Sequence, residues 1–414
     1  MSAGAAASQP DGRNLTWLYL GRALRSVSTA FLTVIFPLYL ARQGYGAVQL
    51  GVVLSLSGVI TMALVAAVGL GSDHYGRRTM ILVLAALSAL GGFALAFFPP
   101  GLVAVVLASG LGGVGRGGGA GSGGSWGPVF PAEQPLVAAS TSPRRRVEAF
   151  GRLSFVGVIA GAAGSLVAAV PALLQAHGVA LVEGYRLLFG LGGALGVAMV
   201  FATLPIVEPP PQDPPPEGDG ASATMPFRQL ISRLGLTNAL NGFGFGFLGP
   251  LLTYWFYRRF GVGPGEIGVM YTVVNLAAAL PYLGSAALTR RLGEVRTVVW
   301  TRALSSLTLL AMPFLPSFTL AGAMFTLRMV LNSLGMPARQ SFTMGVADER
   351  HRSRVAAFGS LPSQLTSTIS PAIGGALMEI SLSLPLFGAA FFMLANVVTY
   401  GLAFRHVPST IDDD

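Results

Sequence analysis

Twelve long apolar stretches, separated by short polar or charged segments, make up most of the chain. They cover residues 15–41, 47–70, 79–98, 102–138, 149–174, 185–205, 230–257, 265–288, 297–314, 318–345, 354–379 and 385–405. Each contains about 18 or more mostly apolar residues, which is enough for an α-helix to cross the hydrocarbon core of a bilayer. The pattern therefore predicts an all-α polytopic membrane protein with twelve transmembrane helices.

The composition agrees with a chain that lies mostly in lipid. Of the 414 residues, 52% are hydrophobic and 10% are charged, whereas a soluble domain carries about 25% charged residues. The chain has no cysteine, which excludes disulfides, thiol nucleophiles and cysteine metal sites. The net charge of +9 does not indicate nucleic-acid binding, because basic residues in a membrane protein mark its cytoplasmic loops.

The arginines outside the apolar stretches gather on one side of the predicted membrane. When the N-terminus is placed in the cytoplasm, only Arg42, Arg186, Arg258 and Arg259 fall on the external side. The cytoplasmic side then holds Arg77, Arg78, Arg144, Arg145, Arg146, Arg228, Arg233, Arg290, Arg291, Arg296, Arg350, Arg352, Arg354 and Arg405. By the positive-inside rule, we expect a multi-pass protein of a prokaryotic plasma (inner) membrane with both termini in the cytoplasm.

A proline-rich segment divides the chain near its midpoint. Residues 205–226 contain many prolines, which exclude a helix and favour an extended linker. The sequence thus predicts an N-terminal six-helix bundle (1–204), a cytoplasmic linker (205–226) and a C-terminal six-helix bundle (227–414).

The two sides of this linker share short motifs in the same order. Gly44–Gly51 matches Gly261–Gly268, Pro131–Gln134 matches Pro337–Gln340, and Arg146–Gly151 matches Arg354–Gly359. Three ordered matches through turn and charged positions indicate that a six-helix unit has been duplicated.

A short charged turn between the second and third apolar stretches reads G-L-G-S-D-H-Y-G-R-R. Its key positions are Gly69, Asp73, Gly76, Arg77 and Arg78. This spacing resembles the signature between the second and third helices of the major facilitator superfamily (MFS) of secondary transporters. The resemblance implies two pseudo-symmetric six-helix bundles around a central cavity, and transport by alternating access. The turn is then either a topology anchor or a conformational latch that holds two helices together in one transport state, and we expect the latch.

Charged residues inside the apolar stretches are candidate functional groups, because they are costly in hydrocarbon unless they face a cavity or a partner. Glu133 and Arg339 occupy equivalent positions of the two halves. We expect them to pair when the cytoplasmic side is closed; the alternative is that each is a solvated charge at a helix end. Glu133 is also the candidate for proton coupling, with Asp73 as the alternative. Arg116, in a glycine-rich run, either donates to neighbouring backbone carbonyls or acts in coupling or gating.

Further polar residues are candidates for the wall of the cavity. Arg22 and Arg25 are three residues apart and share a helix face. They either reach back to the membrane surface or give the cavity a positive wall. The neutral candidates, for which hydrogen bonding between helices or a place at the membrane interface is the alternative role, are Asn238, Asn241, Tyr254, Asn332, Gln340 and Gln364.

These features predict a secondary active transporter and not an enzyme. The histidines lie in loops or tails without metal-ligand spacing, and the chain contains neither G-x-S-x-G nor G-x-x-x-x-G-K-[ST]. We expect no catalytic residue, metal or cofactor, and no nucleic-acid partner. The expected partners of a monomer are a small-molecule solute, protons and the lipid bilayer. The first hypothesis is proton-coupled export, by antiport, of drug-like or metabolite solutes. The alternative is proton-coupled uptake of an organic anion, which the arginines favour.

Overall fold

The computed structural model describes residues 13–98, 101–114, 127–141, 146–208, 227–346 and 352–405. Within these ranges the regular structure is helical and no strand occurs. In chain order the elements are α1 (Arg13–Arg42), α2 (Ala47–Tyr75), α3 (Arg77–Phe97), α4 (Leu102–Gly112), α5 (Phe130–Ala139), α6 (Arg146–Val167), α7 (Val170–Ala176), α8 (Leu181–Thr203), α9 (Phe227–Phe260), α10 (Pro264–Ala279), α11 (Pro281–Leu292), α12 (Glu294–Ala311), η2 (Met312–Phe314), α13 (Phe318–Val346), α14 (Arg352–Ile380) and α15 (Leu384–Phe404).

Most of the predicted stretches form one continuous helix, and prolines explain two of the breaks. The fifth stretch forms α6 and α7, and the eighth forms α10 and α11. Pro171 and Pro281 stand in the first turns of α7 and α11, where a residue without a backbone N–H is tolerated. A third proline accompanies a kink in α9, where Gly249 has the non-helical angles φ 18° and ψ −131° immediately before Pro250.

The fourth stretch contributes α4 and α5. Residues 115–126 between these helices, which include Arg116, lie outside the described residues. Residues 209–226, the greater part of the predicted linker, also lie outside them.

Six spans in the described part of the chain are long and apolar enough to cross a membrane on these two criteria alone. They are formed by α1, α2, α3, α6 together with α7, α8 and α15. Of the described helices in the C-terminal half, only α15 meets both criteria. Two of the others, α10 and α11, have only 16 and 12 residues, while α12 and α13 carry buried polar groups such as Arg302 and Arg328. The other helices of the C-terminal half are recognised as spans from the repeated pattern of the whole chain, because their own hydropathy and length do not identify them.

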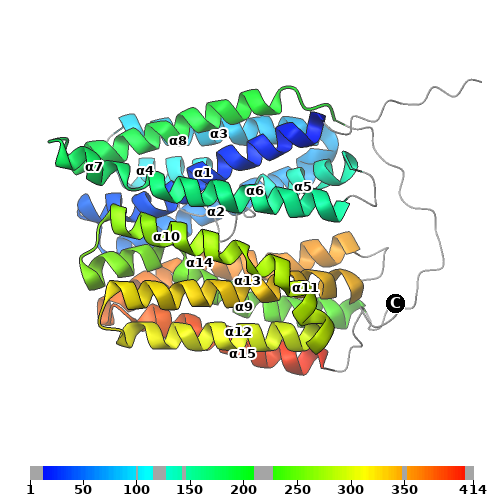
Figure 1. The fold of residues 1–414 in the computed structure, drawn as a ribbon. Coiled ribbons are helices and arrows are strands. Elements are labelled where there is room, and N and C mark those ends of the chain that lie inside the picture. The colour runs from blue at the N-terminus through cyan, green and yellow to red at the C-terminus, as the bar shows by residue number, and fades with distance from the viewer. Residues whose placement is uncertain are drawn as a thin grey trace, which may run out of the picture.

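The helices form two bundles that lie side by side (Figure 1). The N-terminal bundle contains α1–α8, in which α3 packs on α8, α1 on α6 and α8, and α2 on α4. The C-terminal bundle contains α9–α15, in which α9 packs on α14 and α15, and α12 on α13 and α15. We call the end where α1 begins and α2 ends the arginine face, and the end where α1 ends and α2 begins the α1–α2 face.

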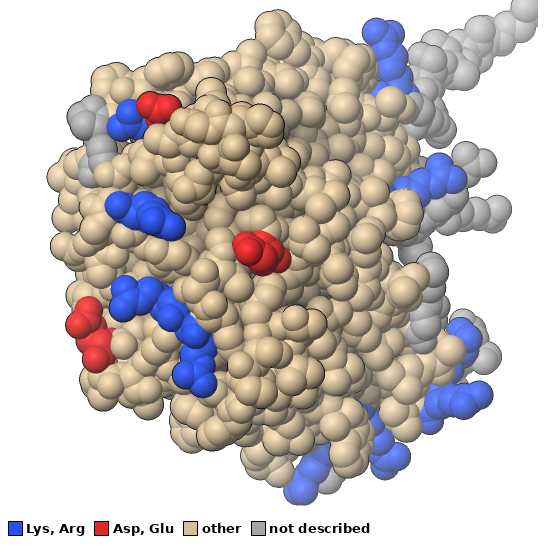
Figure 2. All heavy atoms as spheres, turned by 60° about the vertical axis from the view of Figure 1, so that its left-hand side comes forward, with Lys and Arg blue, Asp and Glu red and all other residues tan. Residues whose placement is uncertain are grey.

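The outer surface of the bundles is apolar. Large side chains such as Leu90, Phe201 and Phe391 are each more than three-fifths exposed. Figure 2 shows charged side chains gathered toward the ends of the helices, with a band free of charge between them on the side in view. Such a band is the surface expected of helices that stand in hydrocarbon.

The buried apolar side chains that the structure describes form three clusters, and their distribution shows how the bundles meet. The largest cluster contains residues of both bundles, among them Phe36 of α1 and Trp255 of α9. At the arginine face each bundle has a cluster of its own, one around Leu136 in the N-terminal bundle and one around Phe342 in the C-terminal bundle. Among the described residues, the two bundles therefore share a core near the α1–α2 face and have separate cores at the arginine face.

Candidate functional site

Glycine lets α2 and α14 touch near the α1–α2 face. A Cβ atom on Gly51 would lie 2.3 Å from the carbonyl oxygen of Pro371, and one on Gly375 would lie 2.4 Å from a carbonyl oxygen of α2. The Ser55 Oγ atom accepts a hydrogen bond from the Ala372 amide at 2.9 Å. Only residues without a side chain allow the two backbones to approach this closely.

A second contact between the bundles joins α6 and α10. Thr272 Oγ1 donates to the carbonyl oxygen of Ala162 at 3.2 Å, and Asn275 Nδ2 donates to Ser165 Oγ at 3.3 Å. A third contact places the guanidinium of Arg42, at the end of α1, 6.0 Å from the ring centre of Tyr257 in α9.

These three contacts all lie in the half of the molecule next to the α1–α2 face. Together with the separate apolar clusters at the other end, they show that the bundles are closed against each other at the α1–α2 face and have separate cores at the arginine face. Polar groups that lie between helices toward the arginine face are therefore the place to look for a solute site.

In the N-terminal bundle, Glu133 of α5 pairs with both arginines of α1. Its Oε2 atom lies 2.8 Å from Arg25 Nη2 and 3.3 Å from Arg22 Nη2, and the side chains of Arg22 and Glu133 are only 2% and 3% exposed. The three groups carry a net charge of +1. Arg22 and Arg25 thus turn inward to a carboxylate, and the alternative in which they reach back to the membrane surface does not describe this geometry.

In the C-terminal bundle, the equivalent place holds a neutral partner. Arg339 of α13 donates to the Asn238 side-chain oxygen of α9. The sequence match Pro131–Gln134 with Pro337–Gln340 makes Arg339 the counterpart of Glu133. Glu133 and Arg339 do not pair with each other in this state, in which the bundles have separate cores at the arginine face. Each of the two residues has a partner in its own bundle.

Arg302 of α12 is a buried cation that the sequence reasoning did not single out. Its Nη1 atom donates to the side-chain oxygens of Asn241 in α9 and Asn396 in α15, both at 2.8 Å, and Asn396 Nδ2 donates to the Thr237 carbonyl. Arg302 therefore joins α12 to α9 and α15, and Asn241, a predicted cavity residue, is its partner on α9. The available signal was an arginine in the middle of the apolar run V-V-W-T-R-A-L-S-S-L.

Arg328 of α13 is buried among soft, apolar groups. Its guanidinium contacts the sulfur atoms of Met329 and Met393 at 3.3 and 3.4 Å and lies 5.9 Å from the Phe325 ring centre. The side chain is 2% exposed. Among the residues that the structure describes, no carboxylate forms an ion pair with Arg328 or with Arg302.

In the signature turn, the carboxylate at the start of α3 comes from Glu208. Its Oε1 and Oε2 atoms accept the backbone amides of Arg77 and Arg78 at 2.6 and 3.4 Å, where a helix N-terminus favours an anion. Gly76 has φ +84°, which favours glycine, and a Cβ there would lie 2.5 Å from Glu208 Oε2 and would displace this carboxylate. Arg78 also donates to the Leu204 carbonyl. Glu208 lies within the predicted linker 205–226, but it acts as a cap on α3.

The turn is thus attached to the end of α8 in its own bundle. The side chain of Asp73 lies outside the described residues. Gly69 faces open space among the residues described, while the neighbouring Leu70 is 83% exposed. Gly69 and Leu70 thus have no covering helix among the described residues in this state, and the latch stays a prediction.

The remaining candidates are dispersed. Tyr254 is buried near the α1–α2 face, where Arg258 lies 5.9 Å from its ring centre. Asn332 of α13 and Gln364 of α14 are half-buried, and the side chain of Gln340 lies outside the described residues. The structure therefore concentrates the charged candidates in two groups, one in each bundle.

Two apolar-surfaced helical bundles that are closed against each other at one face and hold buried charges between their helices define a polytopic membrane transporter. The family model of the Major Facilitator Superfamily matches residues 18–236 and 234–412. The chain belongs to this family, and the predicted MFS fold of twelve transmembrane helices in two pseudo-symmetric bundles is confirmed.

Solved structures of the same fold include a bacterial homologue of the human lysosomal transporter Spinster, inward-facing and unoccupied, with TM-score 0.68, 16% identity and 96% of each chain covered. The inward-open xylose transporter XylE from E. coli has TM-score 0.71 and 13% identity, over 96% of this chain and 97% of that one. The human organic anion transporter MFSD10 (TETRAN) has TM-score 0.60 and 19% identity, over 95% and 98%. The comparison with curated proteins found no match.

Proposed function

We propose that this protein is a secondary active transporter that carries a small organic anion together with protons by alternating access. The observation that supports the solute class is the excess of buried arginines over buried carboxylates. The buried or half-buried cations inside the bundles include Arg22, Arg25, Arg302, Arg328 and Arg339, whereas the buried carboxylates among the described residues are Glu133, which pairs with Arg22 and Arg25, and Glu294 at the start of α12. An arginine at the centre of a membrane helix costs about 3 kcal/mol on insertion scales, so a function must retain them.

Glu133 couples the solute to protons in this proposal. An anionic solute and the Glu133 carboxylate compete for the same two guanidinium groups, those of Arg22 and Arg25. When Glu133 takes up a proton, the two arginines lose their counter-charge and bind the anion in its place. When the anion leaves, Glu133 releases its proton and pairs again. Anion and proton therefore move together.

The rocking of the bundles then explains the roles of Glu133 and Arg339. We place the arginine face in the cytoplasm, which makes the present state inward-facing. In the unloaded carrier, whose Glu133 is ionised, closing that face would bring the two equivalent positions toward each other, and Glu133 would move from Arg25 to Arg339. If Glu133→Arg abolishes transport and adding Arg339→Glu restores none of it, this pairing loses its support.

Export of drug-like solutes, the first hypothesis from the sequence, takes second place. A cationic drug would meet unbalanced positive charge at the site described above. Antiport needs a carboxylate whose proton leaves to water when the solute binds, whereas the Glu133 carboxylate is already held by two arginines. Everted vesicles that are acid inside separate the two modes, because export by antiport accumulates solute in them and proton–anion symport does not.

Proteoliposomes test the proposal directly. With an acidic exterior, a panel of benzoate, succinate and glucose 6-phosphate, compared with the cation tetraphenylphosphonium, should give solute-dependent proton influx with at least one anion and none with the cation.

Glu133→Gln should reduce this influx about tenfold or more, equivalent to the loss of at least 1.4 kcal/mol of coupling, and should leave exchange of labelled for unlabelled anion in place. Glu183→Gln, at an exposed carboxylate of α8, is the matched control. Proton influx with the cation alone would refute the anion proposal.

A further inference from the structure

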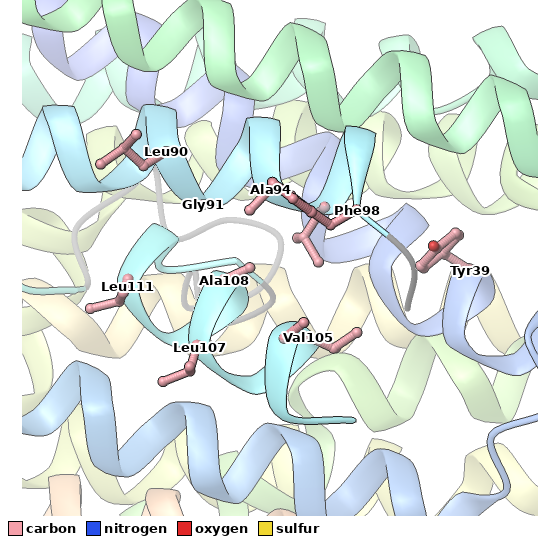
Figure 3. Close-up of a pocket in the computed structure, with 11 residues that line it drawn as sticks. Tyr39, Leu90, Gly91, Ala94, Phe98, Val105, Leu107, Ala108 and Leu111 are labelled. Carbon is pink, nitrogen blue, oxygen red and sulfur yellow. The ribbon is translucent and has the colours of Figure 1, made fainter. Parts of the chain in front are cut away.

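A deep apolar crevice lies between α3 and α4 on the outside of the N-terminal bundle. Its volume is about 260 Å³. Figure 3 shows α3 and α4 on its two sides, with Leu90 and Leu111 toward one end and Tyr39 of α1 at the other. The crevice is distinct from the two groups of charged residues inside the bundles, because apart from the Tyr39 hydroxyl its lining side chains are apolar. They are Leu90, Ala94, Leu95, Phe98, Ala104, Val105, Leu107, Ala108 and Leu111, with Gly91.

The crevice opens to the hydrocarbon. Leu90, Phe98 and Leu107, which line it, are 65%, 64% and 49% exposed on the outer surface. Ala94 and Ala104 present only methyl groups from the two walls. A space of this kind in a lipid-facing surface excludes water and fits an alkyl chain.

The length of the crevice suits the direction in which a lipid chain runs. From Leu90 to Phe98 the α3 wall extends over eight residues, about 12 Å at 1.5 Å per residue, along the helix axis. Near Leu90 the two walls close, since a Cβ on Gly91 would lie 2.4 Å from the Ala108 carbonyl oxygen. The crevice therefore begins near the end of α3 at the membrane surface and ends inside the hydrocarbon layer.

At the surface end stands a hydroxyl without a partner. The Tyr39 ring is fully buried and held by edge contacts to Tyr185 and Phe189, with ring centres 6.3 and 5.0 Å away. Its hydroxyl has no hydrogen-bond partner among the described residues, although a buried hydroxyl is normally bonded. Tyr39 lies three residues before the end of α1, about 4.5 Å below it, the depth at which aromatic residues meet the lipid headgroup region.

We propose that this crevice holds one acyl chain of a membrane phospholipid and that the Tyr39 hydroxyl donates to the ester oxygen of that lipid. The apolar walls bind the chain, and the buried hydroxyl fixes the depth of the ester. The phospholipid is thereby bound at a defined site, unlike the lipids that exchange freely along the rest of the apolar surface.

Native mass spectrometry of the protein released from nanodiscs of phosphatidylglycerol and phosphatidylethanolamine tests this site. The wild-type protein should retain one phospholipid after the detergent wash that removes the others. Ala94→Phe and Ala104→Phe, which fill the crevice from either wall, should each abolish retention. Tyr39→Phe should weaken it about fivefold, the effect of one hydrogen bond.

Val103→Phe is the matched control, because Val103 precedes Ala104, is 71% exposed and does not line the crevice. It should retain the lipid as the wild type does. Equal loss in Val103→Phe and Ala104→Phe, or no retained lipid on the wild-type protein, would overturn the proposal. If a filling variant does not fold, Tyr39→Phe still tests the proposal. Unchanged lipid retention in Tyr39→Phe would show that the hydroxyl does not bind the lipid and would overturn the proposal.

Discussion

A guanidinium group buried in a membrane protein persists only where other groups compensate its charge, and this chain uses three kinds of compensation. Arg22 and Arg25 share a carboxylate, Arg302 is held by two amide oxygens, and Arg328 lies against two thioethers and an aromatic ring. The first arrangement can change with protonation. Removing Arg302 would leave the side-chain oxygens of two asparagines without their donor. Removing Arg328 would leave no polar group without a partner, because its neighbours are thioethers and a ring.

This difference predicts opposite outcomes for two similar substitutions. Arg302→Met removes the donor from Asn241 and Asn396 and should lower the free energy of unfolding by about 1–3 kcal/mol, the cost of buried groups left without partners. Arg328→Met places an apolar chain of similar length among apolar neighbours and should be neutral or stabilising. Thermal unfolding in detergent, followed by intrinsic fluorescence, measures both. An equal loss of stability in the two variants would show that Arg328 has a polar role in the fold.

At the scale of helices, the contact between α2 and α14 depends on two glycines. Because a Cβ on Gly51 would collide with the backbone of α14, Gly51→Val should force the bundles apart at the α1–α2 face and populate the state that is open there. Gly151→Val is a suitable control, since nothing lies within 4 Å of its Cβ position among the described residues.

Cysteine accessibility measures this shift, and the cysteine-free chain makes single labels unambiguous. A cysteine at Ser55, which faces α14, should react at least about tenfold faster with an impermeant maleimide in the Gly51→Val background, as expected if the open state gains 1.4 kcal/mol or more. Unchanged reactivity would mean that α2 and α14 accommodate the side chain without separating.

The helices could be predicted from the sequence because their length and apolar character are local properties. The breaks at Pro171 and Pro281 are also local, and were missed because each lies within an apolar run. Partners depend instead on which helices meet. Arg25 and Glu133 are 108 residues apart, and nothing in either segment says that α1 packs against α5. Glu208 was missed for the same reason, since its role as a cap depends on the return of α8 to the start of α3.

For the whole molecule, the account requires two bundles that move as units about their shared core. The duplicated sequence motifs and the two matches to the same family model support the division into two structural units. The separate apolar clusters at the arginine face allow the two bundles to approach and separate there. In such a mechanism the two faces change in opposite directions, because closing one face opens the other.

Electron–electron distance measurements on two pairs of spin labels in proteoliposomes test this claim most directly. One pair, at Thr79 and Ser232, reports on the arginine face, and the other, at Leu173 and Ser381, reports on the α1–α2 face; all four positions are exposed. When an anion that drives proton influx is added at acidic pH, a shorter distance should appear at the arginine face together with a longer one at the α1–α2 face. A change at one face without the reverse change at the other would contradict the account.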